Sequence, residues 1–253
     1  MTVPPPQGSP REAAHLPTCK DASVDKAALV TGGSSGIGLA IATMLRENGF
    51  ALTLSGRTHE KVIAAAGILT AHPVTADVSK EDDCRRIVNE HREQHGRLDL
   101  LVNSAGVGIA GSIDELDIRH LDRQLNVNLR GLMLVTAAAL PLLREASGII
   151  VNIASIAGTI PSPQLPVYGA TKAAVIQFTT TLNRAEEAHG IRATALSPGF
   201  VDTPMSDFAP IPKEEMIRPA DCAEVVRSLL NLSPRARIPH VVIERVAADG
   251  FGA

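Results

Sequence analysis

Short, nearly unbroken apolar runs recur along this chain, and they limit the folds open to it more than any other feature. Seven such runs span residues 26–31, 50–55, 72–76, 98–103, 148–153, 191–196 and 240–244. A strand with one wet face alternates apolar and polar residues, whereas a strand buried on both faces is apolar throughout. Several of the runs are of the second kind, so we predict a parallel sheet covered by helices on both faces.

Longer segments with helical spacing separate these runs. They cover residues 36–48, 80–95, about 115–145, 168–189 and 219–231. Regular alternation of strand and helix, without an internal repeat or a second-domain linker, predicts one doubly wound α/β domain of the Rossmann type with about seven strands. This domain should span residues 24–253. Residues 1–23 are rich in proline and polar residues and lack periodicity, so we predict a flexible arm there.

Composition limits the kinds of binding partner and the cellular compartment to be expected. Hydrophobic residues make up 45% and charged residues 20%, and the net charge is −3. These values fit a soluble globular protein and give no reason to expect nucleic acid or a membrane as a partner. Three widely spaced cysteines, Cys19, Cys84 and Cys222, suit a reducing compartment. The chain starts without a signal-peptide pattern, and its longest apolar run, residues 131–143, is too short to span a membrane. We therefore expect a cytoplasmic protein.

A glycine-rich loop, TGGSSGIG at residues 31–38, directly follows the first predicted strand and opens the first predicted helix. Glycines at 32, 36 and 38 allow the backbone to approach a pyrophosphate and the helix to pack closely on the strand. The free N–H groups and the dipole of the helix N-terminus favour the phosphates. This context predicts a dinucleotide site.

The loop spacing TGxxxGIG resembles that of the classical short-chain dehydrogenase/reductase family. Five further motifs follow in the family's order, and the resemblance covers about residues 25–232: LVNSAG (101–106), NVNLRG (126–131), GIIVNIAS (148–155), YGATK (168–172) and SPGFVDTPM (197–205). The resemblance implies an oxidoreductase that moves a hydride between a nicotinamide and a carbonyl or secondary alcohol. It also implies a homodimer or homotetramer. The chain's last residues depart from the family's usual ending, which puts the tetramer interface in doubt.

Together, the loop and the resemblance predict a set of cofactor-binding residues. These are Gly32, Ser34, Ser35, Gly36, Ile37, Gly38, Arg57, Asp77, Val78, Asn103, Ala105, Gly106, Tyr168, Lys172, Pro198, Gly199, Val201 and Thr203. Asp77 has a second reading of equal weight, as a turn or N-cap residue before the helix at 80–95.

Tyr168 is the only tyrosine in the chain, and Lys172 follows four residues later. Residues at i and i+4 share one face of a helix, so the phenol and the ammonium should point into one place. A nearby cation lowers a phenol's pKa from about 10, which would suit a general acid/base. Ser155 ends the preceding strand and can donate to a carbonyl oxygen as charge develops there. The resemblance implies that Asn128 links Lys172 to solvent through a water molecule. The alternative is a structural tyrosine.

The end of the second predicted strand bears on which nicotinamide is used. An acidic residue there would hold the ribose 2′-hydroxyl of NAD, but Gly56 stands in that place and Arg57 follows. A guanidinium without a competing carboxylate favours the 2′-phosphate, so we predict NADP(H), with NAD(H) as the alternative. Ser35 stands where many NADP-using relatives carry a second basic residue, which makes the predicted preference moderate.

Other signals guide the remaining expectations. The segment HREQH places His91 and His95 one helical turn apart, but it lacks the zincin order, so we expect a solvated helix end and no metal. The substrate pocket should be lined by Ala154, residues 159–167 and residues 206–215, should be open, and should lack an Arg/Lys cluster for an anion. A nicotinamide-binding sensor or scaffold without turnover, and an NAD-dependent alcohol dehydrogenase, are the competing functions.

Overall fold

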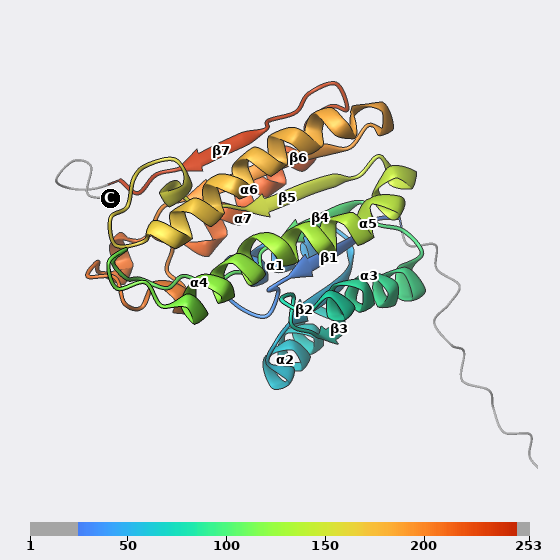
Figure 1. Ribbon diagram of the computed structural model, residues 1–253. Helices are drawn as coiled ribbons and strands as arrows, with labels where there is room; N and C mark the ends of the chain where they lie inside the picture. Colours follow the sequence, from blue (N-terminus) through green and yellow to red (C-terminus); the bar gives the residue numbers. More distant parts are fainter. Residues whose placement is uncertain (1–24, 247–253) are drawn as a thin grey trace, which may run out of the picture.

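The computed structural model describes residues 25–246 (Figure 1). Seven parallel strands form one sheet, as predicted, and their order in it is β3-β2-β1-β4-β5-β6-β7. The strands are β1 (Ala27–Thr31), β2 (Ala51–Gly56), β3 (His72–Thr75), β4 (Leu100–Asn103), β5 (Ile149–Ile153), β6 (Arg192–Pro198) and β7 (His240–Ile243). Each predicted apolar run overlaps one of them, and β2 and β6 extend one and two residues beyond their runs. The predicted arm at residues 1–23 and the end of the predicted domain, residues 247–253, lie outside the described residues.

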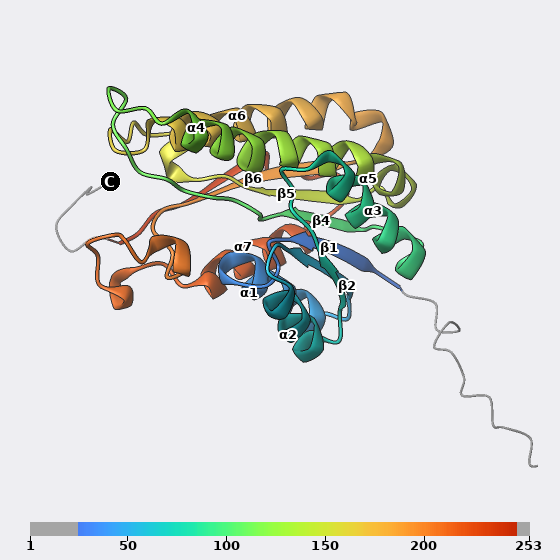
Figure 2. The same cartoon turned by 60° about the horizontal axis from the view of Figure 1, so that its bottom comes forward.

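Helices cover both faces of the sheet (Figure 2). One layer holds α1, α2 and α7, and the other holds α3, α4, α5 and α6. The α-helices are α1 (Gly36–Glu47), α2 (His59–Leu69), α3 (Glu81–His95), α4 (Ile118–Leu125), α5 (Leu132–Ala146), α6 (Pro166–Ala185) and α7 (Pro219–Leu230). Short helical segments are η1 (Asn126–Gly131), η2 (Ile156–Gly158), η3 (Glu187–His189), η4 (Pro204–Ser206) and η5 (Lys213–Glu215).

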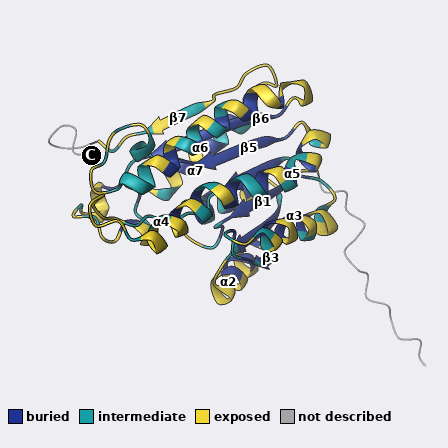
Figure 3. Ribbon diagram, viewed as in Figure 1, coloured by how far each residue is buried: buried dark blue, intermediate teal, exposed yellow. Residues whose placement is uncertain are grey.

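The core lies on both faces of the sheet, as the apolar strands require. All five residues of β1 are buried, and so are all five of β5. Along β1, Val30 belongs to the cluster beneath α1 and α7, whereas Leu29 belongs to the cluster beneath α3 and α5. Figure 3 shows the buried sheet between helices whose outer faces are exposed. Burial on both faces is therefore the physical reason for the continuous apolar pattern.

The chain order places a crevice at the carboxyl ends of the central strands. From β1 the chain moves outward to β2 and β3, then returns to β4 on the other side of β1. Connections leave β1 and β4 in opposite directions, so the loops after these strands diverge above the sheet edge. Ligands of doubly wound sheets bind at such a switch point.

One helix, α2, has no counterpart among the helices predicted from the sequence. Its apolar residues do not follow a single stripe, because Ile63 and Ile68 are exposed to 44% and 83% while Val62 and Leu69 are buried. Gly67 inside the segment further weakens the helical signal. The tertiary position between β2 and β3 determines this helix more than its periodicity does.

The histidine pair on α3 departs from the expected solvated helix end. His91 is fully buried, and its ring lies between the Thr53 hydroxyl, 2.9 Å from Nδ1, and the Arg97 carbonyl, 2.9 Å from Nε2. The His95 ring lies beside it, with ring centroids 5.0 Å apart and ring planes tilted by 58°. Among residues 25–246, no group of three or more metal-ligating side chains is found.

Within the described range 25–246, one helical stretch, Ile118–Ala146, is long and apolar enough by length and composition to cross a membrane. Its second half, α5, packs in the core instead. Val135, Leu142 and Leu143 are buried in the same cluster as Leu101 and Ile150 of the sheet. The apolar run at 131–143 is thus a core helix of this fold.

Candidate active site

The glycine loop between β1 and α1 closely approaches the loop that follows β4. Gly32 has φ +65°, and a Cβ on it would come within 2.9 Å of the Ala105 backbone. A Cβ on Gly38 would collide with the Gly32 carbonyl. Ser35 occupies the N-cap of α1, so the first free N–H groups of the helix point toward the crevice. Backbone N–H groups at the start of α1, beside glycines without side chains, suit a pyrophosphate.

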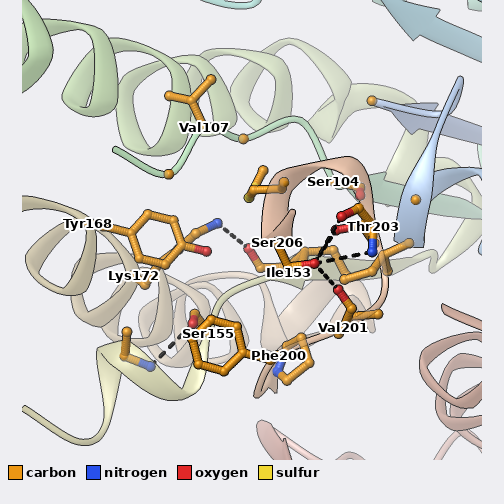
Figure 4. Close-up of a pocket in the computed structure, with 18 of the residues that line it drawn as sticks. Ser104, Val107, Ile153, Ser155, Tyr168, Lys172, Phe200, Val201, Thr203 and Ser206 are labelled. Carbon is orange, nitrogen blue, oxygen red and sulfur yellow. Dashed lines mark hydrogen bonds between the residues drawn. The ribbon is translucent and has the colours of Figure 1, made fainter. Parts of the chain in front are cut away.

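Tyr168 and Lys172 come together on one face of α6, as their spacing predicts. The Lys172 Nζ atom lies 5.5 Å from the centroid of the Tyr168 ring. It donates a 2.7 Å hydrogen bond to the carbonyl of Ile153, the last residue of β5. Figure 4 shows the lysine beside the ring and reaching that carbonyl. The end of β5 therefore fixes the ammonium, and α6 fixes the phenol next to it.

Burial changes the acidity of both groups. The Lys172 side chain is buried, which lowers its pKa to about 8, so the ammonium stays largely protonated at neutral pH. Burial raises the pKa of Tyr168 above its ordinary value, and a hydrogen bond with the Ser155 hydroxyl opposes that rise. The expected lowering of the phenol's pKa by Lys172 is therefore not found in the protein alone, because burial dominates. The phenol is held in its protonated, proton-donating form.

Ser155 lies just past β5 and begins the short segment η2. Its Oγ accepts a 3.2 Å hydrogen bond from the Ala157 backbone N–H, and it also pairs with the Tyr168 phenol. Because the backbone N–H fills an acceptor position, the serine proton stays available for donation. Two hydroxyl groups from different elements, one on the β5–α6 connection and one on α6, thus meet at one point.

Asn128 lies in a π-helical segment, η1, between α4 and α5. Its side chain pairs with the backbone of Val107 in both directions, since Oδ1 accepts from the N–H at 2.8 Å and Nδ2 donates to the carbonyl at 2.8 Å. A Cβ on Gly106 would lie 3.4 Å from Asn128 Oδ1 and 3.6 Å from Lys172 Nζ. Asn128 and Lys172 therefore flank the same piece of backbone. The π-helical turn is a type of irregularity that often occurs at functional sites.

A cavity of about 1250 Å³ joins the glycine loop to Tyr168. Typical small-molecule sites enclose about 300–1,000 Å³, so this one has room for a dinucleotide and a second ligand. The sequence-predicted residues that line it are Gly32, Ser34, Ser35, Gly36, Ile37, Arg57, Val78, Ala105, Gly106, Ser155, Tyr168, Lys172, Pro198, Gly199, Val201 and Thr203. Ala154 and most of the predicted substrate segments also line it.

Four predicted site residues do not line this cavity. Gly38 packs α1 against the loop, and Asn128 lies behind the Val107 backbone. Asn103 is buried and donates to Thr136 and Asn152 in the core. The Asp77 carboxylate accepts hydrogen bonds from the backbone and hydroxyl of Ser79, which agrees with its alternative reading as a turn residue.

Sequence reasoning missed several residues of the cavity wall. Lys61, in the first turns of α2, lines it together with Arg57. Because the sequence did not predict α2, Lys61 could not be placed near Arg57. Arg245, just past β7, lines the opposite end and pairs with Glu215 at 3.1 Å. Ser104, and not the predicted Asn103, lines the cavity after β4 (Figure 4). No local signal marks these residues, because each reaches the cavity only through the arrangement of the sheet.

Comparisons with known proteins agree with this geometry. A family model described as short chain dehydrogenase matches residues 26–212. An uncharacterised oxidoreductase of Staphylococcus epidermidis is 36% identical over 228 residues, which cover 88% of this chain and 98% of that protein.

Solved structures with the same fold hold nicotinamide cofactors. An alcohol dehydrogenase from the archaeon Thermococcus sibiricus, complexed with 5-hydroxy-NADP, has a TM-score of 0.82 at 30% identity, covering 87% of this chain and 97% of that one. A 3-ketoacyl-(acyl-carrier-protein) reductase from Brucella melitensis, complexed with NADH, has a TM-score of 0.81 at 29% identity, covering 88% and 97%.

Proposed function

The chain belongs to the short-chain dehydrogenase family, and from that premise we propose that it reduces a carbonyl compound, or oxidises the corresponding secondary alcohol, with NADP(H) as cofactor. The observation that carries the proposal is the meeting of Ser155, Tyr168 and Lys172 on the wall of a cavity that continues to the glycine loop. A binding protein without turnover would need no protonated phenol beside a buried ammonium.

The residues present fit a bound nicotinamide dinucleotide. Side chains are excluded where the pyrophosphate would lie, because a Cβ on Gly32 would meet the Ala105 backbone at 2.9 Å. Ser55 carries a buried Oγ without a hydrogen-bond partner at the cavity wall beneath Arg57. Gly32–Ile37 would hold the phosphates and Lys172 the nicotinamide ribose. When bound, the cofactor supplies or accepts the hydride.

The chain's own groups would handle the proton. In the reductive direction Tyr168 gives its phenolic proton to the carbonyl oxygen, and the Ser155 hydroxyl donates a hydrogen bond to the same oxygen as negative charge develops. The ammonium of Lys172 stabilises the phenolate left behind. Asn128, fixed on the Val107 backbone, would position a water next to Lys172 for proton return. In the oxidative direction these transfers reverse.

The cofactor preference rests on charge at the end of the cavity next to β2. Arg57 and Lys61 both line this end and are exposed, and neither makes an ion pair with another residue of the described range 25–246. The only acidic residue among the cavity-lining residues described is Glu244, which follows β7. A 2′-phosphate would meet two cations and no carboxylate, which favours NADP over NAD.

The test is the reduction of a panel of ketones, once with NADPH and once with NADH. The rate is measured from the decrease in absorbance of the reduced nicotinamide. We expect a higher kcat/KM with NADPH. Arg57→Ala should lower kcat/KM for NADPH about tenfold or more, the scale of one hydrogen bond to a charged group, and should leave NADH almost unchanged. Lys61→Ala should act in the same direction. A wild type that prefers NADH, or unchanged selectivity in Arg57→Ala, would contradict the preference.

Turnover itself is tested in the same assay. A protein that binds nicotinamide but reduces no ketone and oxidises no secondary alcohol would be a sensor or scaffold. We propose a cytoplasmic location, supported by the two described cysteines, Cys84 and Cys222, which are free and buried.

A further inference from the structure

The part of the cavity beyond Tyr168 is walled by large apolar side chains. They come from two segments, residues 160–165 before α6 and residues 204–211 after β6. We call five of them the apolar wall: Ile160, Leu165, Met205, Phe208 and Ile211. Ser162 and Gln164 lie in the same part and are polar but uncharged. The two segments are far apart in sequence and meet only because β5 and β6 are neighbours in the sheet.

Met205 brings the apolar wall next to the reacting group. A methyl-sized atom placed on Gly108 would lie 3.7 Å from Met205 Sδ and 3.7 Å from Tyr168 Cε2. Gly108 has no side chain, so the space between these two groups stays open. A substituent of a carbonyl held at the phenol can therefore reach Met205 through this space.

The apolar wall continues outward from Met205 to side chains that are partly in water. Met205 is 43% exposed and Phe208 is 59% exposed, although both line the cavity. Large apolar side chains at a concave site gain free energy when a ligand covers them. This is the arrangement expected for a hydrocarbon chain that leaves the phenol and runs toward the mouth of the cavity.

Charged groups at this end oppose an anionic substrate. Among the lining residues described there, only Glu244 and Arg245 carry charge. The Arg245 side chain is 16% exposed, and its Nη1 already lies 3.1 Å from Glu215 Oε2. A substrate carboxylate would have to displace Glu215 and would then face Glu244 as well. Lys213 is a further cation near this wall, but its Nζ already lies 2.9 Å from Asp207 Oδ1 and 3.6 Å from Asp202 Oδ1.

We propose that the substrate is an apolar ketone or secondary alcohol whose hydrocarbon chain extends from the phenol across Met205 to Phe208. This inference rests on the proposed reductase activity for the chemistry, but the apolar wall defines the ligand independently of turnover. The polar end of the substrate is its carbonyl, and the rest is hydrocarbon.

The first experiment measures kcat/KM with NADPH for 2-alkanones from butanone to decanone, each paired with a ketone that ends in a carboxylate. Each buried methylene should raise kcat/KM about two- to fourfold, and each carboxylate partner should react more slowly than its alkyl counterpart. Chain-length independence, or preference for the carboxylate series, would overturn the proposal.

Variants locate the effect on the wall. Phe208→Ala and Met205→Ala should both flatten the rise of kcat/KM with chain length. Ile68→Ala removes a side chain that is 83% exposed on α2 and does not line the cavity, so it should keep the wild-type slope. An unchanged slope in both Phe208→Ala and Met205→Ala would place the hydrocarbon elsewhere and refute the assignment.

A binding measurement separates this inference from the proposed activity. Calorimetric titration of 2-alkanols into the protein with saturating NADP⁺ reports affinity whether or not turnover occurs. Suppose that affinity rises with chain length and falls in Phe208→Ala, but no member of the series is turned over. This result would support the apolar ligand site and refute the proposed reductase activity. Affinity independent of chain length would refute the apolar site even if turnover were observed.

Discussion

Tyr168 is the residue on which the proposed chemistry depends most directly. Tyr168→Phe keeps the ring beside Lys172 but removes the hydroxyl that we propose passes a proton to the substrate oxygen. We expect kcat to fall about 10²- to 10⁴-fold, the range for loss of a general acid. The NADPH dissociation constant, measured by nicotinamide fluorescence, should change less than twofold if the fold is intact. Turnover that survived the substitution would remove Tyr168 from the mechanism.

His91 makes the stability of the protein sensitive to acid. The Arg97 carbonyl can only accept, so Nε2 carries the proton and Nδ1 accepts from the Thr53 hydroxyl. Burial lowers the pKa of His91 from 6.5 to about 4, with the neighbouring His95 adding to the shift. Between these values the unfolded chain binds a proton that the folded chain does not, so stability falls as the pH falls.

The expected loss from this residue is about 3 kcal/mol between pH 6.5 and 4. Denaturant titrations at several pH values measure it. His91→Gln keeps a donor for the Arg97 carbonyl and cannot titrate, so the free energy of unfolding should depend less steeply on pH in this range. His120 is exposed on α4 and provides the control His120→Gln, whose pH dependence should match the wild type. Equal slopes in all three proteins would disprove the assignment.

At the scale of elements, the close contact between α1 and the glycine loop sets the position of the helix N-terminus. Gly38→Ala places a Cβ against the Gly32 carbonyl, so α1 must move away from β1. We expect a loss of about 1–3 kcal/mol from this overpacking, and weaker NADPH binding because the loop moves with the helix. Thermal unfolding and cofactor titration measure the two effects.

Gly67→Ala on α2 is the matched control, because nothing lies within 4 Å of the added methyl group. Alanine is favoured over glycine inside a helix by about 0.5–1 kcal/mol, so this variant should be as stable as the wild type or more so and should bind NADPH normally. If Gly38→Ala were as stable as Gly67→Ala and bound NADPH equally well, the contact between α1 and the glycine loop would not constrain the helix position.

For the whole molecule, we propose self-association through the face of α4 and α5. Ile118 and Leu125 are 60% and 38% exposed. A groove on this face is lined by Leu125, Leu129, Met133 and Leu134, together with Asn126 and Arg130. A second copy of the chain would cover these side chains. Light scattering should give a mass of at least twice the 26.6 kDa of one chain. Leu125→Glu should reduce that mass, whereas Ile68→Glu on α2 should not. A monomeric wild type would contradict the proposal.

The strands and the glycine loop follow from sequence because local forces determine them. Continuous apolar runs such as residues 148–153 can be satisfied only by burial on both faces, and all seven became strands. The spacing of Tyr168 and Lys172 predicts their meeting because one helix carries both. Most residues predicted to contact a cofactor line one cavity, because they belong to loops at the carboxyl edge of the sheet.

Residues whose role depends on distant neighbours could not be predicted in this way. The sequence does not show that Asn103 turns into the core toward Asn152, because that contact exists only once β4 and β5 pair. Burial of His91 depends on packing α3 against β2, and the pKa of Tyr168 depends on how deeply α6 encloses the ring.

The sequence by itself determined the parallel sheet, the glycine loop and the phenol–ammonium pair, because each is encoded within one element or one turn. Only the tertiary structure decided that Lys61 joins Arg57 and that Met205 lies next to Tyr168. These side chains come from elements far apart in the chain, and the order of the strands determines which of them share the cavity.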